Sequence, residues 1–199
     1  PTPILGEVGH SFSENMLVAA KGNRSMVAEQ FRIIRSNLQY FLQKKEKATI
    51  LVTSTFSGEG KTYASSNIAA VHALAGKKTV LLEFDIRKPK ILSGLNMEKA
   101  PGISNYLAGK VDDISMLIRP VADHDNLFVL GCGPVPPNPA EILLDERINK
   151  LFQYLQSNFD FVIIDTAPVG MVSDAMTLGK FADCTIYLTR QSYSFKKQL

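Results

Sequence analysis

Short, unbroken apolar runs alternate with segments of helical periodicity along most of the chain. The apolar runs occur at the start of the stretch 48–62 and at residues 79–84, 127–130, 161–164 and 184–188. Runs of this length are typical of strands buried on both faces of a parallel sheet. Strands that alternate with helices need crossover connections, which place helices on both faces of the sheet. The pattern therefore predicts an α/β fold with three layers and a mostly parallel central sheet.

The segments between the apolar runs predict helices. An apolar stripe at helical spacing begins after Asn23 and consists of Val27, Phe31, Ile34, Leu38 and Phe41. Further helices are predicted after Lys61 as far as Gly76, over 103–107 and 114–117, over 140–157 behind Pro139, and after Ser173-Asp174. Residues 1–22 show little periodicity, and we expect an N-terminal arm or linker followed by one domain at 23–199.

The composition is that of a single soluble domain. The 199 residues are 45% hydrophobic and 21% charged, and the net charge of +3 is too small to indicate nucleic-acid binding. Cys132 and Cys184 have no metal-like spacing and lie in or beside apolar runs, so we expect buried thiols. No run reaches transmembrane length and no signal peptide is evident, which predicts a soluble, cytoplasmic chain.

The stretch 48–62 has the strand–loop–helix order of a phosphate-binding P-loop. Two glycines precede Lys61 and Thr62, although Thr55 stands where the pattern G-x-x-x-x-G-K-[ST] has its first glycine. Glycines allow backbone N–H groups to close on phosphate oxygens, and the helix N-terminus adds its dipole. Lys61 would add a full positive charge, and Thr62 a hydroxyl ligand to Mg²⁺. We therefore expect a nucleotide-binding loop here.

Carboxylates follow two further apolar runs, with Glu83 and Asp85 at the second and Asp165 at the fourth. In a parallel sheet, ligands gather beyond the carboxyl ends of the strands, so these groups are expected near the P-loop. Asp165 suits a Mg²⁺ site shared with the P-loop hydroxyl, and Asp85 is free to accept the proton of an attacking hydroxyl or water. The alternative for Asp85 is an ordinary loop carboxylate paired with Arg87 or Lys88.

These motifs resemble the cytoplasmic domain of the bacterial tyrosine kinases (BY-kinases) of capsular and exopolysaccharide synthesis, within the deviant P-loop ATPase superfamily. The resemblance covers about residues 24–199. It is carried by the P-loop at 58–62, by Asp85-Ile86-Arg87 as the second half of an additional acidic motif, and by the Walker B strand at 163–168. A loop-to-helix string at 136–143 separates the kinases from the partition ATPases of the same superfamily.

A second string that separates the two groups is Glu29-x-x-Arg32-x-x-Arg35. By spacing alone these residues favour a solvent-exposed charged face, about 140° from the apolar stripe of the same helix. The resemblance instead implies a subunit interface, through which such kinases form ring-shaped homo-oligomers.

The resemblance implies an ATP- and Mg²⁺-dependent, autophosphorylating protein-tyrosine kinase that regulates polysaccharide synthesis and export. It implies catalytic roles for Lys61, Asp85 and Asp165, and a metal site of Thr62, Glu83 and Asp165. ATP or ADP would contact Ser57, Gly58, Glu59, Gly60, Lys61, Thr62 and Tyr63. Arg190, after the fifth apolar run, is a candidate for packing on adenine or, equally, a surface arginine.

The implied partners are tyrosine-containing protein substrates and a transmembrane polysaccharide chain-length regulator, in the same chain or a partner chain. The implied place is the cytoplasmic face of the bacterial inner membrane, with this fragment itself soluble.

The sequence departs from the family pattern in four respects. Ser57 and Ala167 replace prolines, and Glu83 stands where the first position of the acidic motif is normally Asp. The C-terminal tyrosine cluster is missing, and we expect a truncated tail. Two alternatives stay open. One is a partition-type ATPase that hydrolyses ATP to drive dimerisation, although Thr55 and Phe56 offer no signature lysine for that group. The other is a catalytically weak, nucleotide-bound regulatory module.

Overall fold

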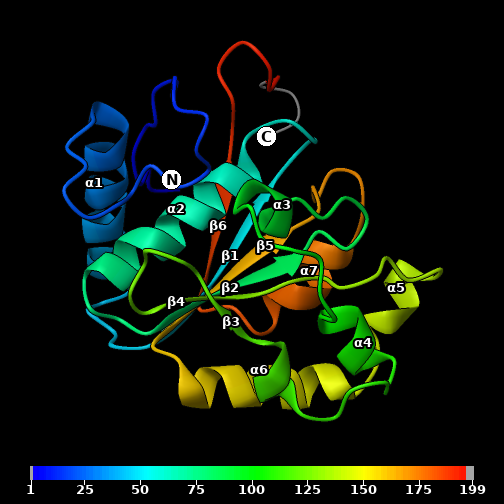
Figure 1. Cartoon of the computed structure of the whole chain (residues 1–199). Coiled ribbons are helices and arrows are strands. Elements are labelled where there is room, and N and C mark those ends of the chain that lie inside the picture. Colours follow the sequence, from blue (N-terminus) through cyan, green and yellow to red (C-terminus); the bar gives the residue numbers. More distant parts are fainter. Residues whose placement is uncertain (1, 196–199) are drawn as a thin grey trace.

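The computed structural model describes residues 2–195, which form a six-stranded sheet in the order β3-β4-β2-β5-β1-β6. The neighbours from β4 to β6 are parallel, and β3 runs antiparallel to β4. Figure 1 shows the sheet passing through the middle of the molecule. The strands are β1 (Ala48–Ser54), β2 (Thr79–Phe84), β3 (Arg119–Pro120), β4 (Leu127–Leu130), β5 (Phe161–Thr166) and β6 (Cys184–Leu188).

Helices cover both faces of this sheet, so the predicted three-layer α/β fold is confirmed (Figure 1). The helices are α1 (Met26–Phe41), α2 (Lys61–Leu74), α3 (Ile91–Gly94), α4 (Ile103–Leu107), α5 (Pro139–Ile142), α6 (Arg147–Asn158) and α7 (Asp174–Gly179), with a 3₁₀ helix at Ile114–Leu117. One core lies between the sheet and α1 and α2, and the other between the sheet and α4, α6 and α7. Successive residues of the central strands alternate between these cores, which explains why the runs are apolar throughout.

Helix α1 confirms the apolar stripe in most of its length. Phe31, Ile34 and Leu38 are buried, whereas Phe41 at the last position is exposed. The hydroxyl of Ser25 accepts a hydrogen bond from the Ala28 N–H at 3.3 Å and caps the first turn. The helix therefore starts at an identifiable cap and packs on α2 through one face.

The segment predicted as a single helix over 140–157 is two helices, and that prediction was wrong. Helix α5 ends at Ile142, and α6 begins at Arg147. Between them, Asp145 Oδ1 accepts the Arg147 N–H at 2.8 Å. A short side chain that takes a nearby backbone N–H competes with helical hydrogen bonding, which accounts for the interruption. The two-residue strand β3 and the four-residue helix α3 were not predicted either.

The N-terminal segment has neither helix nor strand over residues 2–22, yet part of it is fixed against α2. The buried Asn67 accepts the N–H groups of Val18 and Ala19 at 2.9 and 3.0 Å and donates to the Met16 carbonyl at 2.8 Å. Val18 and Ala19 thereby join the α1–α2 core. Among the described residues, no helix is both long and apolar enough to cross a membrane.

Candidate nucleotide and phosphotransfer site

The loop between β1 and α2 has the backbone of an anion-binding turn. Gly58 and Gly60 have φ values of +90° and +97°, in the left-handed region that glycine adopts without strain. Gly60 is the N-cap of α2, and no side chain caps the helix there. The first-turn N–H groups of α2 consequently face the loop without a side-chain acceptor, as a bound phosphate requires.

Lys61 begins α2 and is 6% exposed. Its Nζ lies 3.4 Å from the Phe56 carbonyl oxygen, so the side chain folds back along the loop. Burial lowers the pKa of this ammonium, while Asp165, Asp85 and Glu59 oppose the shift. The protein thus surrounds one buried cation with three carboxylates at the end of the sheet.

Asp165 lies in β5 and is 1% exposed. Burial raises its pKa to about 7, the charge of Asp85 adds to the shift, and the hydroxyls of Thr62 and Ser65 and the Lys61 ammonium oppose it. Its Oδ1 has no hydrogen-bond partner in the described part of the chain. An orphaned carboxylate oxygen near a threonine hydroxyl fits a Mg²⁺ site, because Mg²⁺ takes one or two protein oxygens together with phosphate oxygens and waters.

The raised pKa of Asp165 predicts a pH-dependent stability. Between about pH 4 and about pH 7, the unfolded chain releases this proton and the metal-free folded chain retains it, so folding loses stability as the pH rises. Asp165→Asn should therefore stabilise the metal-free protein relative to wild type. The gain should grow from about pH 5 to about pH 7 and then level off. Urea unfolding at both pH values measures it, and a pH-independent difference would contradict the buried acid.

Asp85 follows β2 and is half-buried. Burial raises its pKa, and the Lys88 backbone N–H at 3.2 Å and the Lys61 and Lys90 charges oppose the shift. Neither predicted basic partner pairs with it: Lys88 contributes only its backbone, and Arg87 Nε lies 3.5 Å from Asp174 Oδ2. The geometry therefore favours a carboxylate facing the P-loop over an ordinary loop ion pair.

Glu83 is 2% exposed and uses both carboxylate oxygens on backbone amides. Oε1 accepts the Ile91 N–H at 2.5 Å, and Oε2 accepts the Cys132 N–H at 3.0 Å. It stands beside Asp165 in the parallel register of β2 and β5. Glu83 thus ties the end of β2 to α3 and to the segment after β4.

Three of the remaining predicted nucleotide contacts, Glu59, Tyr63 and Arg190, make contacts within the chain. Glu59 is buried, and burial by itself raises the pKa of its carboxyl group. Hydrogen bonds from the Ser194 hydroxyl, the Phe56 N–H and Ser54, together with the Lys61 charge, outweigh this effect, so the pKa of Glu59 is lowered overall. The Tyr63 ring packs edge-on against Phe31 of α1. Arg190 donates to the Gly58 carbonyl at 2.9 Å.

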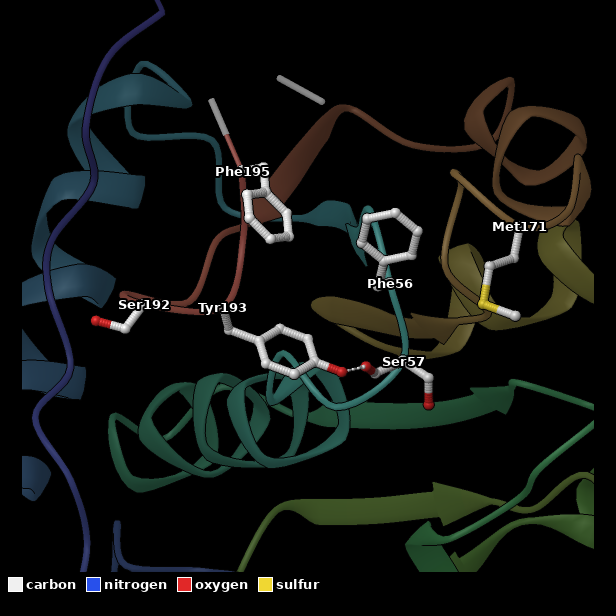
Figure 2. Close-up of a pocket in the computed structure, with 6 residues that line it drawn as sticks. All are labelled: Phe56, Ser57, Met171, Ser192, Tyr193 and Phe195. Carbon is white, nitrogen blue, oxygen red and sulfur yellow. Dashed lines mark hydrogen bonds between the residues drawn. The ribbon is translucent and has the colours of Figure 1, made fainter. Parts of the chain in front are cut away.

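A pocket of about 520 Å³ opens beside the start of the P-loop (Figure 2). It is lined by Phe56, Ser57, Met171, Ser192, Tyr193 and Phe195. Of the residues after β6, Arg190 was predicted as a nucleotide contact, whereas Ser192, Tyr193, Ser194 and Phe195 were not. Tyr193 and Ser194 carry no motif, and they meet the P-loop across more than 130 positions of sequence.

The predicted subunit interface on α1 consists of Glu29, Arg32 and Arg35. These residues make several contacts within the chain. Arg32 pairs with Glu29 and donates to the Asn23 carbonyl at 2.7 Å, and Arg35 donates to the Val71 carbonyl of α2 at 3.0 Å. The Arg35 Nε is buried without a partner in the described residues. Both arginines therefore help to pack α1, whatever else they contact.

The sheet, the glycine turn at the start of α2 and the acidic groups at the adjoining strand ends define a P-loop ATPase-like α/β domain. A distant fold likeness agrees with this class. The septum site-determining protein MinD complexed with Mg-ADP, from Pyrococcus horikoshii, superposes with a TM-score of 0.60 at 20% identity, over 72% of this chain and 58% of that chain. That level of identity shows the fold alone.

Closer relatives identify the family. The tyrosine-protein kinase YwqD of Bacillus subtilis is 32% identical over 182 residues, which are 92% of this chain and 76% of that protein. The tyrosine-protein kinase Wzc of Salmonella typhi is 30% identical over 94% of this chain, but over only 26% of its own length. The crystal structure of the chimerical protein CapA2B2 superposes with a TM-score of 0.90 at 32% identity, covering 98% of this chain and 84% of that one. No protein-family profile matches. The chain belongs to the bacterial tyrosine kinases of capsular and exopolysaccharide systems.

Proposed function

We propose that this domain transfers the γ-phosphoryl group of ATP to tyrosine hydroxyls of proteins, its own tyrosines included. The observation that carries the proposal is the meeting of Lys61, Asp85 and Asp165 at one end of the sheet. All three are wholly or partly buried, and their charges influence one another. Membership of the tyrosine kinases supplies the reaction class, and the site supplies residues for each role.

The phosphate-binding residues act by position and charge. Backbone N–H groups of residues 58–62 face the phosphates, and the Lys61 ammonium neutralises charge on the β- and γ-phosphates. Thr62 and Asp165 would hold Mg²⁺, which when bound offsets charge on the phosphate oxygens. Because the site is buried, these interactions are stronger than they would be in water.

Asp85 would act as the base. A tyrosine oxygen attacks the γ-phosphorus and its proton passes to the Asp85 carboxylate, while the bond between the γ-phosphorus and the bridging oxygen breaks and ADP leaves. The raised pKa of Asp85 makes this carboxylate a better proton acceptor than an exposed aspartate. In this proposal Glu83 acts on the metal site only by holding the strand ends in place, through its two backbone contacts.

Incubation of the purified chain with γ-labelled ATP and a tyrosine-containing protein tests the proposal. Label on tyrosine supports a kinase. Free phosphate without labelled protein would instead identify a partition-type ATPase, and neither product would identify a regulatory nucleotide-binding module. Thr55 and Phe56 near the start of the P-loop offer no signature lysine of the partition ATPases, so we expect the first result.

The wider setting of the domain is also a proposal. The chain matches most of YwqD but about a quarter of Wzc, so related domains occur in chains of very different length. We propose that this domain works with a transmembrane chain-length regulator, either fused to it or as a partner chain. It would then act at the cytoplasmic face of the inner membrane.

A ring-shaped homo-oligomer through α1 is proposed on the resemblance. Arg32→Ala should shift the sedimentation profile toward monomer, because it removes a partly exposed cation from the proposed contact. Arg35 is left in place, since its bond to Val71 holds α1 on α2. Gln39→Ala, an exposed change on the same helix, is the control. Identical profiles for Arg32→Ala and wild type would argue against this interface.

A further inference from the structure

Three residues after β6 hold three consecutive residues of the P-loop. Arg190 Nη1 donates to the Gly58 carbonyl at 2.9 Å, the Tyr193 hydroxyl donates to the Ser57 carbonyl at 2.8 Å, and the Ser194 hydroxyl bonds the Glu59 carboxylate. Figure 2 shows the Tyr193 hydroxyl directed at Ser57. We call Arg190, Tyr193 and Ser194 the clasp.

The clasp is a tied turn of its own. The Arg190 carbonyl accepts the N–H groups of Tyr193 and Ser194 at 3.1 and 2.9 Å, and the Ser194 hydroxyl oxygen accepts the Arg190 N–H at 2.8 Å. The Arg190 guanidinium carbon also lies 5.6 Å from the centre of the Tyr193 ring, within cation–π range. These contacts among Arg190, Tyr193 and Ser194 fix the positions of the three side chains relative to one another.

Arg190 and Tyr193 bond the P-loop through its carbonyl groups rather than through its N–H groups. A peptide unit is planar, so the carbonyl of one residue and the N–H of the next point in opposite directions. Donors that hold the Ser57 and Gly58 carbonyls therefore fix the N–H groups of Gly58 and Glu59 in the opposite direction, away from the clasp. Parallel N–H groups without an anion repel one another, and the clasp offsets that cost before a phosphate binds.

Close packing at Gly58 agrees with this role. A Cβ at that position would lie 3.1 Å from the Tyr193 hydroxyl oxygen, and the φ of +90° is one that other residues rarely adopt. Glycine is required both by the turn and by the approach of the tyrosine. In the described part of the chain, the N–H groups of Gly58 and Glu59 donate to no backbone acceptor, so they remain available to a ligand.

We infer that Arg190 and Tyr193 are positioning residues that orient the P-loop amides for polyphosphate binding. This rests on the proposed nucleotide site and goes beyond it, because it assigns the residues after β6 to the phosphates rather than to the base. Arg190 as a platform for adenine is the competing assignment.

Binding of Mg-tripolyphosphate, which has no base, separates the two assignments. Tyr193→Phe and Arg190→Met should each weaken binding of Mg-tripolyphosphate and of Mg-ATP by the same factor, about fivefold for one lost hydrogen bond. Titration calorimetry on the full chain measures both ligands. Amide NMR shifts of Gly58 and Glu59 should move in the ligand-free variants, which a distant packing defect would not produce.

Tyr40→Phe is the matched control, because it removes an exposed tyrosine hydroxyl on α1 rather than one that bonds the P-loop. It should leave both affinities unchanged, and comparable thermal unfolding would show that all variants fold. Unchanged binding in Tyr193→Phe and Arg190→Met would overturn the inference. A loss confined to ATP would overturn it in favour of a base contact, and a wild-type chain that binds neither ligand would overturn the proposed nucleotide site as well.

Discussion

Replacing Lys61 by methionine is expected to reduce tyrosine phosphorylation by at least about 10³-fold while the domain stays folded. The ammonium is the buried positive charge at the start of α2. Methionine has a similar length and leaves the apolar stem in place. Since burial lowers the pKa of Lys61, the folded chain bears a cost for its charge, and the variant should unfold at an equal or higher urea concentration.

Initial rates with labelled ATP and urea unfolding on the same preparation test this expectation. Lys150→Met, an exposed change on α6, controls for the loss of one positive charge. Retained phosphotransfer in a folded Lys61→Met protein would rule out the proposed role of Lys61 in neutralising phosphate charge. A loss of activity accompanied by unfolding would show instead that Lys61 holds the loop together.

Replacing Asp85 by asparagine should lower kcat by about 10²–10⁴-fold, because the amide cannot accept the tyrosine proton. ATP affinity should change by no more than about twofold, since the base contributes only in the transition state. In wild type, kcat should rise with pH as Asp85 loses its proton, over a range above that of an exposed aspartate. In the variant this limb of the profile should be absent.

Steady-state kinetics and a separate measurement of ATP binding check the expectation for Asp85. Asp125→Asn, an exposed substitution away from the site, is the control. An equal loss of ATP affinity and kcat would move Asp85 from the base to the metal-binding group. The Lys61→Met and Asp85→Asn variants thus separate the residue proposed to bind the phosphates from the residue proposed to accept the proton.

Much of the fold follows from local signals in the sequence. Each central strand is buried on both faces, so its sequence is a continuous apolar run that stands out from the helical segments. The two-residue strand β3 has no such signal, and the break between α5 and α6 coincides with a local hydrogen bond from the Arg147 N–H to the Asp145 side chain. Features as short as these leave no trace in the periodic pattern of hydrophobic residues, so that pattern does not predict them.

Some residues of the candidate site could also be predicted from the sequence, and others could not. Asp85 and Asp165 were predictable because parallel topology brings strand ends together, and Lys61 because the P-loop is contiguous in sequence. The sequence shows that position 83 carries a carboxylate, but it does not show whether this carboxylate binds a metal ion or accepts backbone N–H groups. The clasp could not be predicted, because it joins residues 57–59 to 190–194 through the conformation of a loop.

The place of β5 in the sheet has a consequence for how the protein is made. This strand lies between β1 and β2 and pairs with both, yet it follows them by some 80 to 110 residues. During synthesis β1 and β2 therefore leave the ribosome well before the strand that joins them. Only the β2–β4 and β3–β4 pairs can form before β5 is made, and β1 and the second edge of β2 stay unpaired until residue 166 has emerged. The nascent chain should accordingly depend on chaperones until β5 closes the sheet.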